Sequence, residues 1–426
     1  MKTALLCVAA LAGASPAAAQ GTAATPHRIA LVGGQVLDPV GRRFLADQTI
    51  LIEDSVITAI FPAGTRLLPP DAQMIDIRGR YVIPGLIDTH VHLATDPDGE
   101  DSRARTTARL YAALYGGVTS VRDMAGDARV LAGLARDARV GGIASPDIYY
   151  AALFSGPAFF ADPRTHSSAR GAVAGAVPFM RAVTDTTDLT LAVAQAKGTG
   201  ATAIKLYAAL DSGLVARIVT EAHRQGLLVW AHAALNPAMP AQVVGAGVDA
   251  VSHATLLLRA MTRDELAAVR RDAEAGKPIV LQSEVLDAVL RRMAAHGVMF
   301  DPTLFIFGDT PAFQRLAAAL TRRAFEAGVL ISTGTDSLGA ADSLAPPNIY
   351  QEMELLVSAV GIPPEAALLA ATTHGARTIG IADRVGTLEA GKQADLVVLR
   401  ADPLADITNV AQVEFVVKRG RLFRRQ

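Results

Sequence analysis

The hydrophobic pattern of the chain changes twice along its 426 residues. Short strand-like runs separated by turn signals come first, at residues 28–32, 49–60 and 72–77. From residue 81 onward, apolar runs of about five residues alternate with longer Ala-, Arg- and Leu-rich stretches, which is the pattern of successive βα units. Strand-like runs return at the end of the chain, at residues 395–399 and 415–423.

The central region contains candidate strands separated by helical stretches. The strands are predicted at residues 81–92, 118–124, 148–154, 203–207, 227–232, 250–253, 298–304 and 329–336. Helices are predicted at residues 102–115, 214–224 and 312–327, among others. Alternating strands and crossover helices in this number predict an α/β fold, a (β/α)8 TIM barrel over residues 81–383. We expect the two chain ends, residues 27–80 and 384–426, to form a small β-sandwich domain together.

The first residues have a pattern of their own. Lys2 precedes an apolar run at residues 4–13, and three alanines follow at 17–19, which is the arrangement of a secretory signal peptide over residues 1–19. The run is too short for a permanent membrane span. We therefore expect an exported protein, periplasmic or secreted, that does not bind a membrane. The single cysteine, Cys7, lies in this segment, so no disulfide is expected in the mature chain.

Composition and charge exclude some classes of function. Hydrophobic residues make up 51% and charged residues 19% of the chain, which predicts a packed globular core rather than long disorder. The net charge of −1 provides no basic surface of the kind that binds nucleic acid. The expected partner is therefore a small molecule or a dipeptide-like substrate. A homo-oligomer is compatible with this composition.

Polar residues with metal-binding chemistry stand at the ends of the predicted strands. His90 and His92 end the first strand, where residues two apart point to the same side and can reach one ion. His232, His253 and Asp336 end the fifth, sixth and eighth strands. A single histidine at such a place is more often a hydrogen-bonded core residue. Together they indicate a metal site, because barrel active sites lie at the carboxyl ends of the strands.

Lys205 lies on the fourth predicted strand, inside the barrel. A bare ammonium is costly in such a place, so two alternatives are open. The lysine pairs with a carboxylate, or it reacts with carbon dioxide to become an anionic carbamate that bridges two cations. We favour the carbamate, because metal ions repel an ammonium group. Tyr207 lies two residues further along the strand, faces the same side and is a candidate substrate contact.

The segment 155–188 is long for a connection between a strand and a helix. Segments of this length are often lids or binding loops. It carries Phe159 and Phe160 together with His166 and Arg170, which are candidate substrate-binding residues. An apolar lid with a few cationic groups would suit an apolar acyl group or amino acid with a free carboxylate. The alternative is a surface loop that packs on its own barrel or on another subunit.

Taken together, these residues resemble the amidohydrolase superfamily. The segment 84–92, Lys205, His232, His253 and Asp336 carry the resemblance, and residues 386–399 look like the family's closing β-sandwich segment. Within the superfamily, the chain is similar to the imidazolonepropionase-related branch. That branch includes metal-dependent Xaa-Pro dipeptidases and ochratoxin-hydrolysing amidases.

The resemblance implies a set of roles for these residues. His90, His92 and Asp336 would hold one metal ion, and His232 and His253 the other. Carboxylated Lys205 would bridge two divalent ions, with zinc as the expected metal. Asp336 would also take a proton from the shared hydroxide and pass it to the leaving nitrogen. The implied activity is a metal-dependent hydrolase that cleaves an amide C–N bond in a peptide-like or N-acyl amino acid substrate.

Two other readings remain at this point. One is a single-metal cyclic amidase or deaminase, in which Lys205 stays unmodified. The other is a non-catalytic amidohydrolase-like binding protein that kept the barrel. Such proteins usually lose metal ligands, whereas all six ligand positions are filled in this sequence.

Overall fold

The computed structural model describes residues 27–38, 42–95, 102–337 and 345–424. The signal peptide predicted over residues 1–19 lies outside the described residues. Within the described part of the chain, no helix is both long enough and apolar enough to cross a membrane.

Seven strands of the central region pair in parallel in the order of the sequence. They are β6 (Leu86–Val91), β7 (Val118–Asp123), β8 (Asp147–Ser155), β11 (Ala203–Leu206), β12 (Leu228–His232), β13 (Ala250–Ser252) and β14 (Met299–Asp301). The eighth position is an extended segment that pairs with β14 through a bridge between Phe300 and Ile331. It also closes on β6, because the backbone nitrogen of Thr89 donates to the oxygen of Thr333 at 2.8 Å. The predicted α/β fold with a parallel barrel is confirmed.

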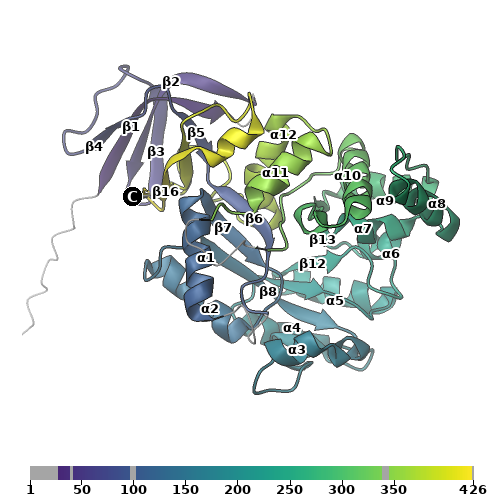
Figure 1. Cartoon of the computed structure of the whole chain (residues 1–426). Helices are drawn as coiled ribbons and strands as arrows, with labels where there is room; N and C mark the ends of the chain where they lie inside the picture. Colours follow the sequence, from purple (N-terminus) through teal and green to yellow (C-terminus); the bar gives the residue numbers. More distant parts are fainter. Residues whose placement is uncertain (1–26, 39–41, 96–101, 338–344, 425–426) are drawn as a thin grey trace, which may run out of the picture.

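Helices cover the outside of the barrel between successive strands (Figure 1). They are α1 (Arg103–Tyr115), α2 (Ala128–Val140), α4 (Leu189–Gly198), α5 (Ser212–Arg224), α6 (Pro240–Gly245), α7 (Ala254–Leu257), α8 (Arg263–Glu274), α9 (Glu284–His296) and α10 (Pro311–Glu326), with short 3₁₀ helices at Leu258–Ala260 and Phe305–Phe307. Helix α5 shows why they form. Its buried residues recur at helical spacing, and Asp211 caps its first turn by accepting from the nitrogen of Leu214 at 2.9 Å.

The C-terminal part of the barrel is followed by further helices. They are α11 (Ile349–Ser358), α12 (Pro364–Leu369) and α13 (Gly375–Thr378), with a π-helical turn at Ala370–His374 and a 3₁₀ helix at Ile407–Ala411. Buried Glu352 on α11 accepts from the backbone nitrogens of Leu304 and Phe305, at 3.0 and 2.7 Å. It thereby holds the segment that leaves β14.

Both chain ends meet in a second, separate sheet (Figure 1). Its strands are β1 (Arg28–Asp38), β2 (Arg43–Glu53), β3 (Val56–Pro62), β4 (Gln73–Asp76), β5 (Tyr81–Pro84), β15 (Leu396–Leu399), β16 (Val413–Lys418) and β17 (Arg421–Phe423). The sheet is mixed and encloses a small core of its own, with Ile29, Ile50, Val398 and Phe415 among its buried residues. The strands that the sequence assigned to a small domain built from both chain ends are thus joined in one mixed, hydrogen-bonded sheet.

The strand predicted over residues 81–92 is two strands in two different sheets. Strand β5 joins the terminal sheet, where it pairs with β1 and β15, and β6 opens the barrel at Leu86. Gly85 separates them. A Cβ at this position would lie 2.1 Å from Oγ1 of Thr119, so the turn requires glycine.

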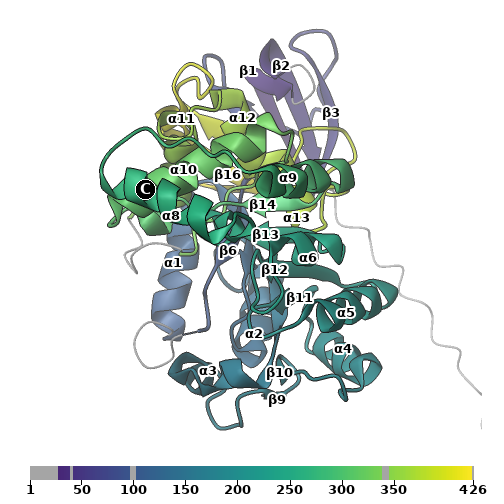
Figure 2. The same ribbon diagram turned by 90° about the vertical axis from the view of Figure 1, so that its right-hand side faces the viewer.

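The long segment after β8 is built from short elements rather than from one open loop. It contains a 3₁₀ helix at Pro157–Ala161, α3 (Pro163–Ser168), β9 (Ala176–Val177) and β10 (Met180–Ala182). Strand β10 pairs in parallel with β8, so the segment returns to the barrel rim. Figure 2 shows α3, β9 and β10 together at one end of the molecule.

A buried charge cluster ties the terminal sheet to the barrel. Nζ of Lys418, on β16, lies 2.8 Å from Oδ2 of Asp395 and 2.6 Å from Oδ2 of Asp147, the first residue of β8. Arg419 adds a contact of 3.0 Å to Asp147. Burial opposes the charged form of Lys418, but the two carboxylates outweigh it and raise the pKa of the ammonium group. The two sheets are therefore joined by a paired charge as well as by apolar packing.

Candidate metal centre

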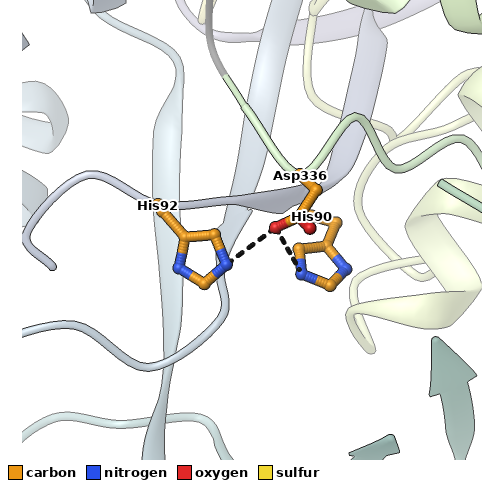
Figure 3. A group of neighbouring side chains, drawn as sticks. All are labelled: His90, His92 and Asp336. Carbon is orange, nitrogen blue, oxygen red and sulfur yellow. Dashed lines mark ion pairs between the residues drawn. The ribbon is translucent and has the colours of Figure 1, made fainter. Parts of the chain in front are cut away.

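His90, His92 and Asp336 meet at the carboxyl end of β6 (Figure 3). Nε2 of His92 lies 2.8 Å from Oδ1 of Asp336, and Nε2 of His90 lies 3.2 Å from the same oxygen. The candidate ligand atoms of the three residues all lie within 4.8 Å of one another. One ion can therefore contact all three side chains.

The charges in this cluster favour an anionic aspartate. Burial disfavours the charged form of Asp336, but the imidazoles of His90 and His92 outweigh this effect. They hold the pKa of Asp336 well below the ordinary value. Burial likewise opposes a charge on His90, yet the carboxylates of Asp336 and Asp301 raise its pKa. A carboxylate that is kept ionised among imidazole nitrogens is a suitable ligand set for a divalent metal ion.

His232 and His253 extend the cluster along the barrel rim. The ring of His253 lies 4.9 Å from that of His90 and 4.8 Å from that of His232, measured between centroids. Burial lowers the pKa of both histidines, and the charges of nearby groups, Lys205 among them, lower it further. The pKa of His253 falls to about 3. Both imidazoles are therefore neutral at physiological pH, which is the form that binds metals.

Lys205 lies among these histidines on β11 and is 1% exposed. Among the described residues, its Nζ has no hydrogen-bond partner. Burial is the largest cause that lowers its pKa, to about 7, and the nearby guanidinium of Arg122 adds to the effect. The simple alternative of a lysine paired with a carboxylate is thus not what the structure contains. A buried amine near His232 and His253, with no hydrogen-bond partner among the described residues, fits a site completed by a further group.

Three residues of the site have positive backbone φ angles. They are His253 at 70°, Thr303 at 52° and Asp336 at 56°. Non-glycine residues adopt this region at a cost, and such strain is concentrated at functional sites, where the surrounding structure holds it in place. The strand ends are therefore shaped to direct these side chains rather than to continue the strands.

The six predicted metal ligands line one cavity of about 570 Å³. Its other walls are partly apolar, formed by Met124, Leu153, Phe159 and Met180, and partly polar, formed by residues of α3 and its flanks, Arg164, Thr165, Ser167 and Ser168. The volume suits a small ligand. The site thus combines a metal-binding cluster with an apolar wall and one guanidinium.

The predicted substrate contacts fall in different places. Tyr207 lines the cavity, with its ring 4.0 Å from that of His232 and 4.5 Å from that of Phe159. His166 and Arg170 do not appear among the described residues that line it, and Nε2 of His166 lies 3.0 Å from the backbone oxygen of Phe160. Arg164, which lies on the same short helix α3 as His166, lines the cavity instead, and the sequence pattern did not predict this helix.

Two buried carboxylates behind the cluster were not predicted as site residues. Asp88 accepts from Oγ1 of Thr335 at 2.7 Å and from the backbone nitrogen of His90 at 3.1 Å, so it holds β6 against the closing segment. Asp301 contacts His90 and the buried guanidinium of Arg122, which lies 4.4 Å above the ring of Trp230. Asp88 stands two residues before His90 on the same strand, which is a signal the sequence offered. Asp301 carries no comparable signal.

Comparison with known proteins agrees with this architecture. A family model described as the amidohydrolase family matches residues 81–423. The chain belongs to the amidohydrolase family. Its expected resemblance to that superfamily is therefore confirmed.

Curated relatives match the chain to different extents. An enamidase of Eubacterium barkeri is 26% identical over 394 residues, which cover 89% of this chain and 87% of the enamidase. An imidazolonepropionase of Geobacillus kaustophilus is 34% identical over 140 residues, which cover 32% of this chain. The chain spans about a third (31%) of the length of that relative.

Solved structures match over nearly the whole chain. A prolidase complexed with N-methylphosphonate-L-proline is 26% identical, with a TM-score of 0.68, and the match covers 94% of this chain and 100% of the prolidase. The ochratoxinase of A. niger has a TM-score of 0.72 at 21% identity, covering 94% of this chain and 97% of that structure, which shows a shared fold.

Proposed function

We propose that this member of the amidohydrolase family is a binuclear metal-dependent enzyme that hydrolyses an amide C–N bond in a peptide-like or N-acyl amino acid substrate. The observation that carries the proposal is the convergence of four histidines, Asp336 and Lys205 on a single cavity. The likeness to a prolidase complexed with a proline phosphonate supports this substrate class.

The residues divide into two groups around the cavity. His90 and His92, with Asp336, would hold one divalent ion, and His232 and His253 the other. Zinc suits this set, because neutral imidazoles and carboxylates are its usual nitrogen and oxygen ligands. When bound, the ions would polarise the scissile carbonyl and lower the pKa of a water molecule so that it attacks at neutral pH.

Lys205 would join the two groups as a carbamate. Its neutral Nζ forms a bond to the carbon of CO₂ and loses one proton, which leaves an anion with two oxygens. The buried amine has no hydrogen-bond partner among the described residues. The carbamate that replaces it would be stabilised by two cations. The negative charge would also offset part of the charge of the two cations, which neutral imidazoles cannot do.

Asp336 is placed to move the proton during hydrolysis. Its Oδ1 lies at the centre of the cluster, and its low pKa keeps the carboxylate ionised before the reaction. Asp336 would accept a proton from the attacking water and deliver it to the leaving nitrogen, which leaves as a neutral amine.

The walls of the cavity would select the substrate. Phe159 and Met180 offer an apolar surface for an acyl group or side chain. Arg164 is held by Asp162, with Nη2 2.6 Å from Oδ2, and hydrogen-bonds with Tyr207. We infer that Arg164 and Tyr207 face the free carboxylate of the substrate, because a guanidinium binds carboxylates in a defined geometry.

A screen of zinc-loaded protein against dipeptides and N-acyl amino acids tests this proposal. Release of the free amino acid should be detected for substrates with an apolar acyl group and a free carboxylate. The same compounds with an amidated carboxylate should react more slowly. Binding of zinc without hydrolysis of any C–N substrate would favour the non-catalytic reading.

One observation favours the single-metal alternative. Among the described residues, the only group of three compact enough to hold one ion is His90, His92 and Asp336. A cyclic amidase or deaminase with one ion and an unmodified Lys205 would use this group alone. Metal stoichiometry separates the two readings.

We also propose that the protein is exported, on the basis of the leader pattern over residues 1–19. Amino-terminal sequencing of the natural protein should find a start near residue 20. An intact Met1 would contradict the proposal.

A further inference from the structure

The segment that leaves β14 contacts two of the histidines from behind. It begins with Asp301, the last residue of the strand, and continues to Thr303. Both side chains are completely buried. Asp301 contacts His90, and Thr303 contacts His253. These histidines belong to the two different halves of the metal centre proposed above.

The contact of Asp301 defines which nitrogen of His90 carries a proton. Oδ1 of Asp301 lies 3.3 Å from Nδ1 of His90. The other oxygen, Oδ2, accepts from Oγ of Ser252 at 3.0 Å and from Nη2 of Arg122. An ionised carboxylate can only accept, so Nδ1 of His90 must be the donor. Nε2 faces the carboxylate of Asp336, and its lone pair is available when an ion takes the place of a proton between the ring and that carboxylate.

The contact of Thr303 leads to the same result for His253. Oγ1 of Thr303 donates its proton to the backbone oxygen of Pro302 at 2.8 Å. The hydroxyl has a single proton, so it can only accept from Nδ1 of His253, which lies 2.9 Å away. Nε2 of His253 is therefore the nitrogen with a free lone pair.

The backbone of the segment is held in this conformation. Thr303 has a φ angle of 52°, which a β-branched residue adopts only under constraint. The two backbone nitrogens that follow, those of Leu304 and Phe305, both donate to the buried carboxyl group of Glu352. The strained position thus directs the hydroxyl of Thr303 at His253.

We propose that Asp301 and Thr303 are positioning residues that fix the Nδ1–H tautomers of His90 and His253 and so present Nε2 of both rings to the metal ions. The inference rests on the metal centre of the proposed function. It assigns to one buried segment the orientation of ligands in both halves of that centre. Groups that orient a ligand histidine in this way typically account for about 10- to 100-fold in metal affinity.

Zinc affinity, measured by competition with a chromophoric chelator, tests the role of Thr303. The variant Thr303→Val keeps the shape and the β-branch, so the backbone strain is unchanged while the hydroxyl is lost. It should bind zinc about 10- to 100-fold more weakly than the wild type. Thr303→Ser should restore most of the affinity. The matched control is Thr321→Val, because Thr321 is also buried but its hydroxyl donates to Ala317 within α10.

Asp301→Asn tests the other half of the proposal through the orientation of its amide. Arg122 and Ser252 both donate to the Oδ2 position, so the amide oxygen must lie there. The amide NH₂ then faces Nδ1 of His90 and moves the proton of the ring to Nε2. We expect weaker zinc binding than in Thr303→Val. The ¹⁵N resonances of the labelled histidines should show the change of tautomer directly.

The outcomes separate this inference from the proposed function. If the wild type binds no zinc, the metal centre and the inference both fall. If the wild type binds zinc and Thr303→Val binds it as tightly as Thr321→Val does, the inference alone is wrong. Unchanged histidine tautomers in Asp301→Asn would overturn the assignment for His90. If Asp301→Asn does not fold, the Thr303 variants still decide the question.

Discussion

Nε2 of His92 lies 2.8 Å from Oδ1 of Asp336, and this contact joins the first strand of the barrel to the segment that closes it. The carboxylate is thus positioned by elements from opposite ends of the barrel sequence. The backbone nitrogen of Asp336 also donates to the backbone oxygen of His90 at 2.8 Å, which fixes the closing segment on β6. These contacts hold Asp336 in place for the ligand and proton-transfer roles proposed above.

Replacement of this carboxylate by an amide tests its proton-transfer role. Asp336→Asn keeps the size of the side chain but removes the base. We expect kcat to fall by about 10²- to 10⁴-fold, the usual contribution of a general acid or base. Steady-state kinetics on the best substrate of the screen provides the measurement. Asp383→Asn, at an exposed position, is the control. A loss in kcat of less than tenfold would assign the proton to another group.

Arg164 is expected to recognise the substrate carboxylate. Arg164→Gln should raise KM for N-acyl amino acids by about 10- to 100-fold, since hydrogen bonds to charged groups contribute about 1.5–3 kcal/mol, while kcat changes little. Substrates with an amidated carboxylate should not distinguish the variant from the wild type. Arg78→Gln is a matched control, because Arg78 pairs with Asp76 in the same local geometry on the terminal sheet. An equal loss with both kinds of substrate would refute this role.

The buried ammonium of Lys418 should be important for stability. Lys418→Met leaves Asp147 and Asp395 buried near each other without their main counter-charge. We expect the free energy of unfolding to fall by roughly 3–5 kcal/mol, as when one partner of a buried ion pair is removed. Denaturation in urea measures the loss. Lys277→Met, which removes an exposed ammonium 3.5 Å from Asp272, should have little effect. Equal stability of the two variants would show that the cluster contributes nothing.

Glu352 should make stability depend on pH. Burial is the main cause that raises its pKa from 4.5 to about 8. A raised pKa means that the folded state binds the proton more tightly than the unfolded state does. The contribution to stability is therefore complete below about pH 4.5 and is lost as the pH rises to about 8.

Thermal unfolding of metal-free protein between pH 5 and 8 measures this contribution. The wild type should lose stability over this interval, by several kcal/mol in order of magnitude, relative to Glu352→Gln. Glu354→Gln, at an exposed position on the same helix, should keep the slope of the wild type. Parallel curves for the wild type and Glu352→Gln would contradict the assignment.

The barrel and the candidate ligands at its strand ends could be predicted from the sequence because their signals are local. An apolar run such as Ala203–Leu206 is buried on both faces of a parallel sheet, so a lysine within it is conspicuous. His90 and His92 are likewise marked by their spacing on one strand. Residues that act through contacts between distant segments have no such mark.

The differences between prediction and structure have the same physical cause. The run at residues 81–92 is apolar throughout, and only the pairing partners of β5 show that it belongs to the terminal sheet. Arg164 and His166 both lie on α3, and only the folded position of this short helix shows that Arg164 lines the cavity. Asp301 and Thr303 are recognisable only from their contacts with His90 and His253.

The metal content of active enzyme and of Lys205→Ala tests the binuclear centre most directly. Elemental analysis of the wild type should find about two zinc ions per chain, in line with the ligand count. Lys205→Ala should keep no more than one ion and lose nearly all turnover, and short-chain carboxylates should partly restore both. If Lys205→Ala retains near-normal turnover with the same metal content as the wild type, the bridging carbamate does not exist.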